Sequence, residues 1–286
     1  MKLLRVGPQG AERPVVLGQD GTAFDLSGRT PDIDGAFLAG LDPAGLAELA
    51  RAVAAGELPE TDLTGQRIGA PVVRPGKVVG IGLNYRDHAA EAGAAIPAEP
   101  VVFLKPSNTV VGPDDEVLIP RGGEKTDYEV ELAIVIGRTG RYLESEAEAA
   151  AVIAGYATVN DVTERAFQFE RGGQWDKGKS AETFTPLGPW LVTADEVGDP
   201  QRLGLRLWVN GELRQDGNTA AMIFPVYELV RYVSQFMVLE PGDVIVTGTP
   251  AGVTLGRPGT PFLRPNDIVE LEVDGLGRQR QVLGKA

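Results

Sequence analysis

Tyr128-Glu129-Val130-Glu131-Leu132-Ala133-Ile134-Val135-Ile136 is the stretch that decides the fold, because it is apolar throughout except for two carboxylates. It predicts a buried β-strand in which Glu129 and Glu131, two residues apart, project from the same face. Two anions side by side in an apolar setting are unfavourable unless a cation lies between them. A second apolar strand, Tyr156–Val159, leads into Asp161, which offers a third carboxylate. These three side chains predict a metal site, and the alternative is an acidic edge strand that faces solvent.

The composition narrows the classes of protein that the chain can belong to. It has 286 residues, of which 43% are apolar and 23% charged, as in an ordinary globular protein. A net charge of −13 argues against nucleic acid or an anionic membrane surface as a partner, since both require a basic surface. The alternative meaning of this charge is simple solubility.

The absence of cysteine and the single histidine, His88, restrict the metal chemistry. Disulfides, thiolate metal sites, a cysteine nucleophile and a multi-histidine zinc site are all excluded. An oxygen-rich site remains, which favours Mg²⁺, Mn²⁺ or Ca²⁺. The first residues, Met1–Pro8, lack the apolar core of a signal peptide, and no apolar run approaches the roughly 20 residues that cross a bilayer. We therefore expect a cytoplasmic protein with no membrane partner.

Turn signals and periodicity predict two parts, a small N-terminal α/β module over residues 1–70 and a larger body over 71–286. A helix in the first part is expected to begin at Asp42-Pro43 and to end at Gly56. Helices are also expected over Glu148–Ala154 and Pro225–Phe236. Hairpin signals occur at Asn210-Gly211 and Asp274-Gly275. The predicted strands are Lys2–Val6, Pro14–Gly18, Thr22–Leu26, Val78–Gly82, Val101–Leu104, Glu116–Ile119, Glu129–Ile136, Tyr156–Val159, Leu205–Val209, Val244–Thr247 and Val269–Val273. This pattern predicts an α+β, β-rich fold, a β-sandwich or roll.

The segment after Asp161 offers groups that could bind a substrate. Asp161, Arg165 and Gln168 are spaced i, i+4 and i+7, which would place them on one face of a helix. An arginine and an amide beside a metal ligand could hold a substrate carboxylate or carbonyl. An ordinary Asp–Arg pair on a helix is the alternative.

His88 and Glu91 follow the glycine-rich strand Val78–Gly82 and are spaced i and i+3 on a predicted short helix. A carboxylate that orients a histidine is typical of a general base that deprotonates water. A structural or surface histidine is the alternative.

The segment Gly173–Ser180 matches the phosphate-binding pattern G-x-x-x-x-G-K-[ST]. A true phosphate-binding loop joins a buried strand to a helix, whereas here the preceding residues predict a helix and Pro186 follows soon after. Asp176 within the loop would also repel phosphate. We interpret the match as coincidental, keep a nucleotide-binding protein as the alternative from another class, and expect Lys179 to point at the site.

Two further features are typical of a pocket. Lys105 follows an apolar run and should need a partner, although it could equally be a lysine at a strand end. Gly248 and Thr249 follow a buried strand, and the backbone amides there could hold an anionic group, a structural turn being the alternative. The chain has neither G-x-S-x-G nor G-x-G-x-x-G, so a serine hydrolase and a nicotinamide-binding fold are unsupported.

In their order along residues 75–285, these motifs together resemble the fumarylacetoacetate hydrolase family. The motifs are Gly82–Tyr85 with His88 and Glu91, Pro100–Pro106, Tyr128–Leu132, Asn160–Arg165 with Gln168, Gly178–Ser180, Pro241–Asp243 and Thr247–Pro250. The resemblance implies a mixed β-sandwich roll, an Mg²⁺ or Mn²⁺ ion on Glu129, Glu131 and Asp161, and commonly a homodimer. The implied substrates are acylpyruvates and related 2-oxo or 2,4-dioxo acids.

The resemblance also implies roles for the side chains. The metal would chelate the 2-oxo carboxylate end of the substrate, while His88, oriented by Glu91, would activate water to attack the distal carbonyl. Cleavage of the C–C bond would release an acid and the enolate of pyruvate, which the metal and Lys179 would stabilise. The residues implied in substrate binding are Arg165, Gln168, Lys105, Tyr85, Gly248 and Thr249.

One departure from the family pattern concerns Asn84. Fumarylacetoacetate hydrolases proper have a further aspartate ligand just before the tyrosine that matches Tyr85, so Asn84 favours a branch with three carboxylates. The chain is similar to bacterial members that split 2,4-diketo-3-deoxy sugar acids. An oxaloacetate decarboxylase, an enol–keto isomerase and a ureidoglycolate lyase on the same site remain alternatives, as does a metal-binding protein without catalysis.

Overall fold

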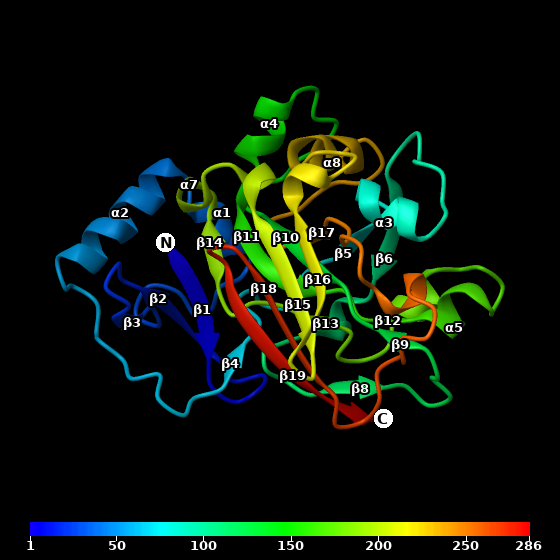
Figure 1. Cartoon of the computed structure of the whole chain (residues 1–286). Coiled ribbons are helices and arrows are strands. Elements are labelled where there is room, and N and C mark those ends of the chain that lie inside the picture. The colour runs from blue at the N-terminus through cyan, green and yellow to red at the C-terminus, as the bar shows by residue number, and fades with distance from the viewer.

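A computed structural model describes all residues, 1–286, and shows two large β-sheets packed face to face (Figure 1). The larger sheet has ten strands in the order β3-β2-β1-β14-β11-β10-β17-β5-β6, and β4 also pairs with β1. Most neighbours are antiparallel, but β17 and β5 are parallel, so the sheet is mixed. The strands are β1 (Lys2–Val6), β2 (Arg13–Leu17), β3 (Ala23–Asp25), β4 (Ile68–Gly69), β5 (Val78–Gly82), β6 (Val101–Lys105), β10 (Val130–Ile136), β11 (Ile153–Asn160), β14 (Leu191–Thr193) and β17 (Val244–Val246).

The smaller sheet has five strands in the order β16-β15-β18-β19-β8, with β19 and β8 parallel. Its hairpins turn at Asn210-Gly211 and Asp274-Gly275, as predicted. Two further pairs of short strands, β12 with β9 and β13 with β7, form separate two-stranded sheets. The bounds are β7 (Val110–Val111), β8 (Val117–Ile119), β9 (Thr126–Asp127), β12 (Thr163–Glu164), β13 (Thr185–Pro186), β15 (Gly204–Val209), β16 (Glu212–Asn218), β18 (Ile268–Val273) and β19 (Gly277–Lys285).

Eight short helices and four single 3₁₀ turns lie around the sheets. The longest helix, α2, begins with Pro43 after the N-cap Asp42, whose carboxylate accepts hydrogen bonds from the backbone N–H groups of Ala44 and Gly45, as its sequence predicts. The helices are α1 (Gly35–Gly40), α2 (Pro43–Ala54), α3 (Arg86–Glu91), α4 (Glu146–Ala151), α5 (Arg165–Phe169), α6 (Asp176–Lys179), α7 (Ala194–Val197) and α8 (Val226–Val233); the 3₁₀ turns are Ser107–Thr109, Pro200–Arg202, Thr219–Ala221 and Thr254–Gly256. No helix is both long and apolar enough to span a bilayer.

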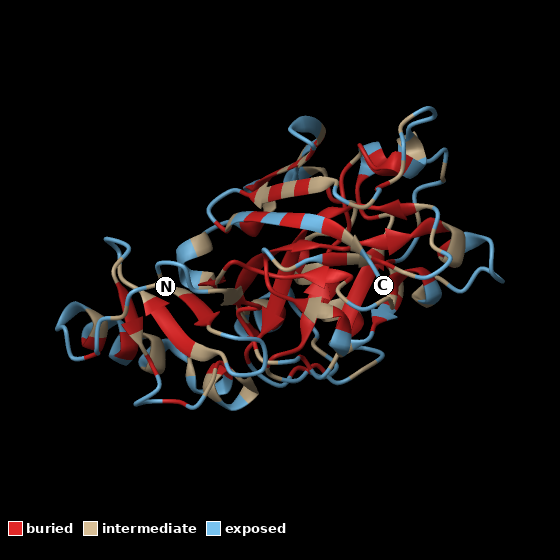
Figure 2. Ribbon diagram, turned by 90° about the horizontal axis from the view of Figure 1, so that it is seen from below, coloured by how far each residue is buried: buried red, intermediate tan, exposed pale blue.

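Strand β10 lies in the interior and separates two apolar cores. Its side chains alternate between two faces. Val130, Leu132, Ile134 and Ile136 belong to a core of 34 residues, and Ala133 and Val135 belong to another of 20. This alternation follows from the period of two in a strand. Figure 2 shows the buried residues gathered along the strands and the exposed ones in the loops and outer helix faces. The first core fills the space between the sheets, since it includes Leu207 of β15.

The structure confirms the predicted α+β, β-rich sandwich and corrects some element bounds. The helix predicted over Glu148–Ala154 is α4, which ends at Ala151, and β11 begins at Ile153, earlier than predicted. The chain from the N-terminus does not lie apart, because β1 pairs with β14 of the body and places the first strands at one end of the ten-stranded sheet.

Candidate active site

The three carboxylates predicted from the sequence converge at the end of β10. Glu131 lies in β10, Glu129 directly precedes it, and Asp161 directly follows β11, the antiparallel neighbour of β10. One carboxylate oxygen from each residue lies within 4.8 Å of the other two. All three side chains are buried, with exposed fractions of 5% or less. We call Glu129, Glu131 and Asp161 the acidic triad.

Buried cations hold two members of the acidic triad. Lys179 Nζ lies 2.7 Å from Glu129 Oε2 and 2.6 Å from Asp161 Oδ2, so this ammonium bridges the two carboxylates. Arg165 Nη2 lies 2.7 Å from Glu129 Oε1, and Lys105 Nζ lies 2.5 Å from Asp161 Oδ1. Burial favours the neutral form of Glu129, but Lys179 and Arg165 outweigh it and lower the pKa of Glu129 to about 2.

Glu131 has no cationic partner. Its Oε2 accepts one hydrogen bond, from the Gly248 N–H at 2.7 Å, and its Oε1 has no partner in the protein. Burial, together with the carboxylates of Asp161 and Glu129, raises the pKa of Glu131 well above its usual range. A buried anion with a free oxygen beside two other carboxylates fits a hard divalent cation, for which carboxylate oxygens are the preferred ligands. The residues present therefore fit the Mg²⁺ or Mn²⁺ ion that the resemblance implies.

Arg165 and Gln168 reach the site from α5, but Asp161 does not share their helix. Asp161 lies before β12, and α5 begins only at Arg165, so the predicted helical face over the three residues is wrong. The structure still brings them to one cavity. Arg165 Nη1 donates to Gln168 Oε1 at 3.1 Å, while the amide nitrogen of Gln168 has no partner in the protein. Gln168 can therefore donate a hydrogen bond to a bound substrate.

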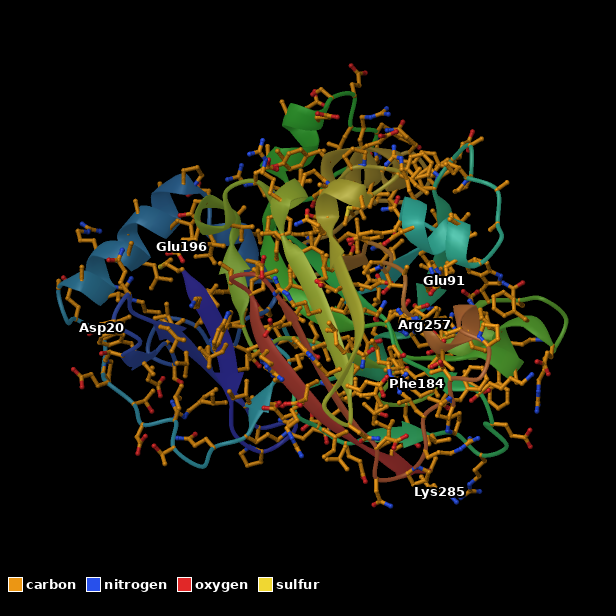
Figure 3. The ribbon with its side chains drawn as sticks, viewed as in Figure 1. Asp20, Glu91, Phe184, Glu196, Arg257 and Lys285 are labelled. Atoms are coloured by element: carbon orange, nitrogen blue, oxygen red, sulfur yellow. The ribbon has the colours of Figure 1, made fainter.

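His88 and Glu91 lie on α3, close to each other but not in a hydrogen bond. His88 Nδ1 is 3.5 Å from Glu91 Oε2, is buried and has no hydrogen-bond partner in the protein. Both carboxylate oxygens of Glu91 accept from the Gly252 N–H, at 3.1 and 3.0 Å. Figure 3 shows Glu91 beside Arg257 of the neighbouring loop, and Arg257 Nε lies 3.5 Å from Glu91 Oε1. Glu91 is thus anchored where it can orient His88, which lines the cavity.

Four residues expected to bind substrate have different positions. Thr249 lines the cavity, and its hydroxyl donates to the Val130 carbonyl. Lys105, Tyr85 and Gly248 do not line it. Lys105 is enclosed behind Asp161, where burial lowers its pKa, so we correct its expected substrate contact to support of that carboxylate. Gly248 likewise acts on Glu131 through its N–H, and the buried Tyr85 hydroxyl has no partner.

The segment Gly173–Ser180 does not have the architecture of a phosphate-binding loop. Helix α5, not a strand, precedes it, and only the four-residue helix α6 lies within it. Its lysine, Lys179, is already bound by two carboxylates. This geometry agrees with the interpretation that the motif match is coincidental. It also agrees with the prediction that Lys179 points into the site.

Asn84, the departure from the family pattern, lies outside the acidic triad and joins chain segments. Its amide nitrogen donates to the carbonyls of Phe224 and Thr247, and its Oδ1 accepts from the Phe224 N–H at 2.9 Å. All of its side-chain polar atoms are therefore engaged in the protein.

Two groups of functional residues are missing from the sequence predictions. Asp127 accepts from Arg165 Nε at 2.9 Å and from the N–H groups of Thr254 and Leu255, so it fixes the arginine and one cavity edge. Strand periodicity could have predicted Asp127, since it precedes Glu129 by two residues and continues the same alternation. The second group is the aromatic wall, which we define as Phe103, Phe169 and Trp175; it comes from three separated segments, and no local pattern predicts it.

The acidic triad and the aromatic wall enclose a cavity of about 250 Å³. Its lining residues are Ile81, Gly82, Leu83, His88, Ala92, Ala94, Phe103, Glu129, Glu131, Asp161, Arg165, Gln168, Phe169, Trp175, Lys179, Thr249, Leu255 and Gly256. The cavity thus has one charged end and one apolar side, a combination typical of small-molecule sites.

This architecture is that of an enzyme with a buried carboxylate site, and sequence comparison assigns its family. The pattern of the fumarylacetoacetate (FAA) hydrolase C-terminal family matches residues 77–283, so the chain belongs to this family. A protein of Burkholderia lata, named provisionally as a hydrolase, is 54% identical over 283 residues, which cover 98% of each chain.

Two similar solved structures carry more specific names. The maleylpyruvate hydrolase of Sphingobium sp. SYK-6, solved with manganese(II) and pyruvate, is 29% identical with a TM-score of 0.82, and the match covers 100% of each chain. The 2-hydroxyhepta-2,4-diene-1,7-dioate isomerase of Mycobacterium marinum is 34% identical with a TM-score of 0.76, covering 100% of this chain and 98% of the other. The chain is therefore similar throughout to a hydrolase and to an isomerase of one enzyme family.

Proposed function

We propose that the protein is an Mg²⁺- or Mn²⁺-dependent hydrolase that cleaves a C–C bond of an acylpyruvate and releases pyruvate. The observation that carries the proposal is the buried acidic triad, with ligand oxygens within 4.8 Å of one another at one end of the cavity. The similarity to a maleylpyruvate hydrolase solved with manganese(II) and pyruvate supports the same chemistry. A divalent cation held by the acidic triad would act as a Lewis acid on the 2-oxo carboxylate end of the substrate.

His88 is the residue suited to activate water. It is the only histidine, lines the cavity and has a free Nδ1 3.5 Å from Glu91. Neutral imidazole would accept a proton from water as the water oxygen adds to the distal carbonyl carbon, and Glu91 would stabilise the imidazolium. The C–C bond then breaks, its electron pair goes to the methylene carbon of the pyruvate part as an enolate, and a proton returns to that carbon. The products are a carboxylic acid and pyruvate.

Lys179 is suited to stabilise the enolate. Its ammonium has three N–H donors, of which Glu129 and Asp161 accept two. The third can be donated to the oxygen on which negative charge develops. The two carboxylates raise the pKa of Lys179 against the effect of burial, so the donor remains charged.

An enol–keto isomerase on the same site is a second candidate, favoured by the similarity to the diene-dioate isomerase. Isomerisation moves a proton within the substrate and uses no water, so it would release no pyruvate. We expect pyruvate release from 2,4-dioxo acids with Mg²⁺ or Mn²⁺, followed by a coupled pyruvate assay. We also expect His88→Ala to abolish this release. Enol–keto interconversion without pyruvate release would identify an isomerase, and retention of hydrolysis by the variant would rule out His88 as the water-activating group.

A further inference from the structure

The cavity has no free cation that could receive a second substrate carboxylate. Arg165 and Lys179 are the lysine and arginine side chains that line it. Arg165 is bound by Asp127 and Glu129, and Lys179 by Glu129 and Asp161, so each already has two carboxylate partners. Both cations lie at the charged end and are committed to it.

The cation that follows the cavity wall in sequence, Arg257, is also paired. It comes directly after the lining residue Gly256, and its guanidinium lies 3.5 Å from Glu91. A substrate carboxylate at this position would compete with Glu91 for the arginine and would lie beside another anion. The surroundings of His88 and Glu91 thus disfavour a further negative charge.

One side of the cavity is apolar and aromatic, and it begins beside the charged end, since the centroid of the Phe103 ring lies 4.9 Å from Lys179 Nζ. The Trp175 ring contacts Phe103 and Phe169, with centroids 6.1 and 5.8 Å apart and tilted or edge-on planes. Leu83 and Leu255 also line the cavity. A distal alkyl or aryl group would be buried here, whereas an unpaired carboxylate would lose its hydration without compensation.

Two glycines show that the aromatic wall is built into the sheet. Gly80 and Gly82 alternate on β5 and so face the same side. A Cβ at Gly80 would lie 2.1 Å from Phe103 Cζ, and one at Gly82 would lie 2.3 Å from Trp175 Cζ3. Both rings therefore occupy space that a side chain at position 80 or 82 would fill, and the apolar side of the cavity is a fixed part of the fold.

We infer that the cavity selects acylpyruvates whose distal acyl group is apolar and discriminates against those whose distal group ends in a carboxylate, an inference that rests on the proposed function. The isomerase to which this chain is similar is named for a 1,7-dioate, which carries two carboxylates. The residues Leu255 and Phe169, half exposed at the cavity, make the selectivity testable because a cation can be introduced at either position.

The experiment compares two matched compounds, 2,4-dioxoheptanedioate and 7-methyl-2,4-dioxooctanoate, in which an isopropyl group replaces the distal carboxylate. With Mg²⁺, kcat/KM from pyruvate release is expected to be about a hundredfold higher for the isopropyl compound. Leu255→Arg is expected to shift the ratio about tenfold toward the dicarboxylate, and Phe169→Arg to shift it in the same direction. Leu213→Arg, a matched control at an exposed leucine of β16 outside the cavity, should leave the ratio unchanged.

Binding of both compounds to the Mg²⁺-loaded protein, measured by calorimetry, separates the inference from the proposed reaction. Tighter binding of the isopropyl compound without pyruvate release would support the inference and contradict the proposed hydrolysis. The inference would be overturned if the dicarboxylate had an equal or higher kcat/KM, or bound equally well or more tightly. It would also be overturned if arginine at neither position changed the selectivity ratio in folded protein. Failure of both compounds to bind would contradict the inference and the proposed function together.

Discussion

At the scale of single residues, Glu131 differs from its two neighbours in the acidic triad because no lysine or arginine neutralises it. Its carboxylate is buried, accepts one backbone hydrogen bond and has a pKa raised well above the usual range by burial and by Asp161 and Glu129. A cation at this position would relieve that unfavourable charge, whereas in the metal-free protein the charge lowers stability.

Glu131→Gln should therefore change metal binding and stability in opposite directions. The amide oxygen can still accept from Gly248, but the negative charge is lost, so we expect Mn²⁺ affinity by calorimetry to fall by about tenfold or more. The free energy of unfolding of the chelator-treated protein should rise at neutral pH. Glu182→Gln, at an exposed position, is the control. Unchanged Mn²⁺ affinity would contradict the role of Glu131 as a ligand.

Tyr128 provides a test of burial through alkaline pH. Burial raises the pKa of Tyr128 to about 12, and its hydroxyl donates to the Gly252 carbonyl at 3.1 Å. The unfolded chain loses this proton near pH 10, so stability from the neutral hydroxyl is complete below that pH and is lost as pH rises toward 12. The loss amounts to about 3 kcal/mol over this window.

In Tyr128→Phe, the part of the free energy of unfolding that Tyr128 loses at alkaline pH should no longer be lost. The contribution of the other buried tyrosines should stay. Urea unfolding of both proteins between pH 8 and 12 measures it, and the wild type should lose more stability than the variant above pH 10. Parallel stability curves would show that Tyr128 does not keep its proton in the folded state.

The sequence predicts those site residues whose signal is local. Glu129, Glu131 and Asp161 follow from strand periodicity and from a strand end, and His88 and Glu91 from helical spacing. Lys105 is different, because its role depends on Asp161, which a long stretch of chain separates from it and only tertiary structure brings within 2.5 Å. Residues whose function comes from a distant partner are not identified by spacing alone.

At the scale of elements, strand β5 positions the cavity wall through residues that lack side chains. Gly82 has an ordinary backbone conformation, so the reason for glycine is space for the Trp175 ring and not torsional freedom. Trp175 directly precedes α6, which ends with Lys179, so a displaced ring would also disturb the charged end of the cavity.

Gly82→Ala is expected to destabilise the protein by about 1–3 kcal/mol, because the new methyl group would lie 2.3 Å from the ring and must displace it. Urea unfolding measures the stability, and a change in tryptophan fluorescence reports the displacement. Gly28→Ala, where the added Cβ meets no atom within 4 Å, is the matched control. Equal stability of the two variants would show that the ring moves aside without cost.

Element bounds follow from the sequence best where one apolar pattern runs without interruption. β1 and β5 have the predicted bounds. The helix predicted through Asp161 fails because the backbone first pairs β12 with β9, and only then turns into α5 at Arg165. A helical spacing of polar residues cannot show that a strand pairing interrupts it.

At the scale of the whole molecule, the N-terminal strands and the body share one sheet and one core. Strand β1 pairs with β14, and the core of 20 residues combines Leu3 and Leu49 from the N-terminal part with Val135 and Val244 from the body. This order of strands is not sequential, so it could not be predicted from a pattern along the chain. The domain boundary near residue 70 and the homodimer remain predictions, the latter testable by sedimentation.

Residues 71–286 produced alone are expected to be unstable and to aggregate. Without residues 1–70, β14 loses its partner β1, and the apolar face formed by Val135 and Val244 becomes exposed. The full chain should accordingly unfold in a single calorimetric transition. Size-exclusion chromatography and circular dichroism of the shortened chain test this expectation, and a monodisperse product with native strand content would contradict it.

Because Gly80 leaves the space that the Phe103 ring fills, the two positions behave as one shared volume. Enlarging one should be tolerated only when the other is reduced, for example Gly80→Ala together with Phe103→Leu. Such compensating exchanges give a protein engineer a route to reshape the substrate chamber from beneath without substituting any ionisable residue.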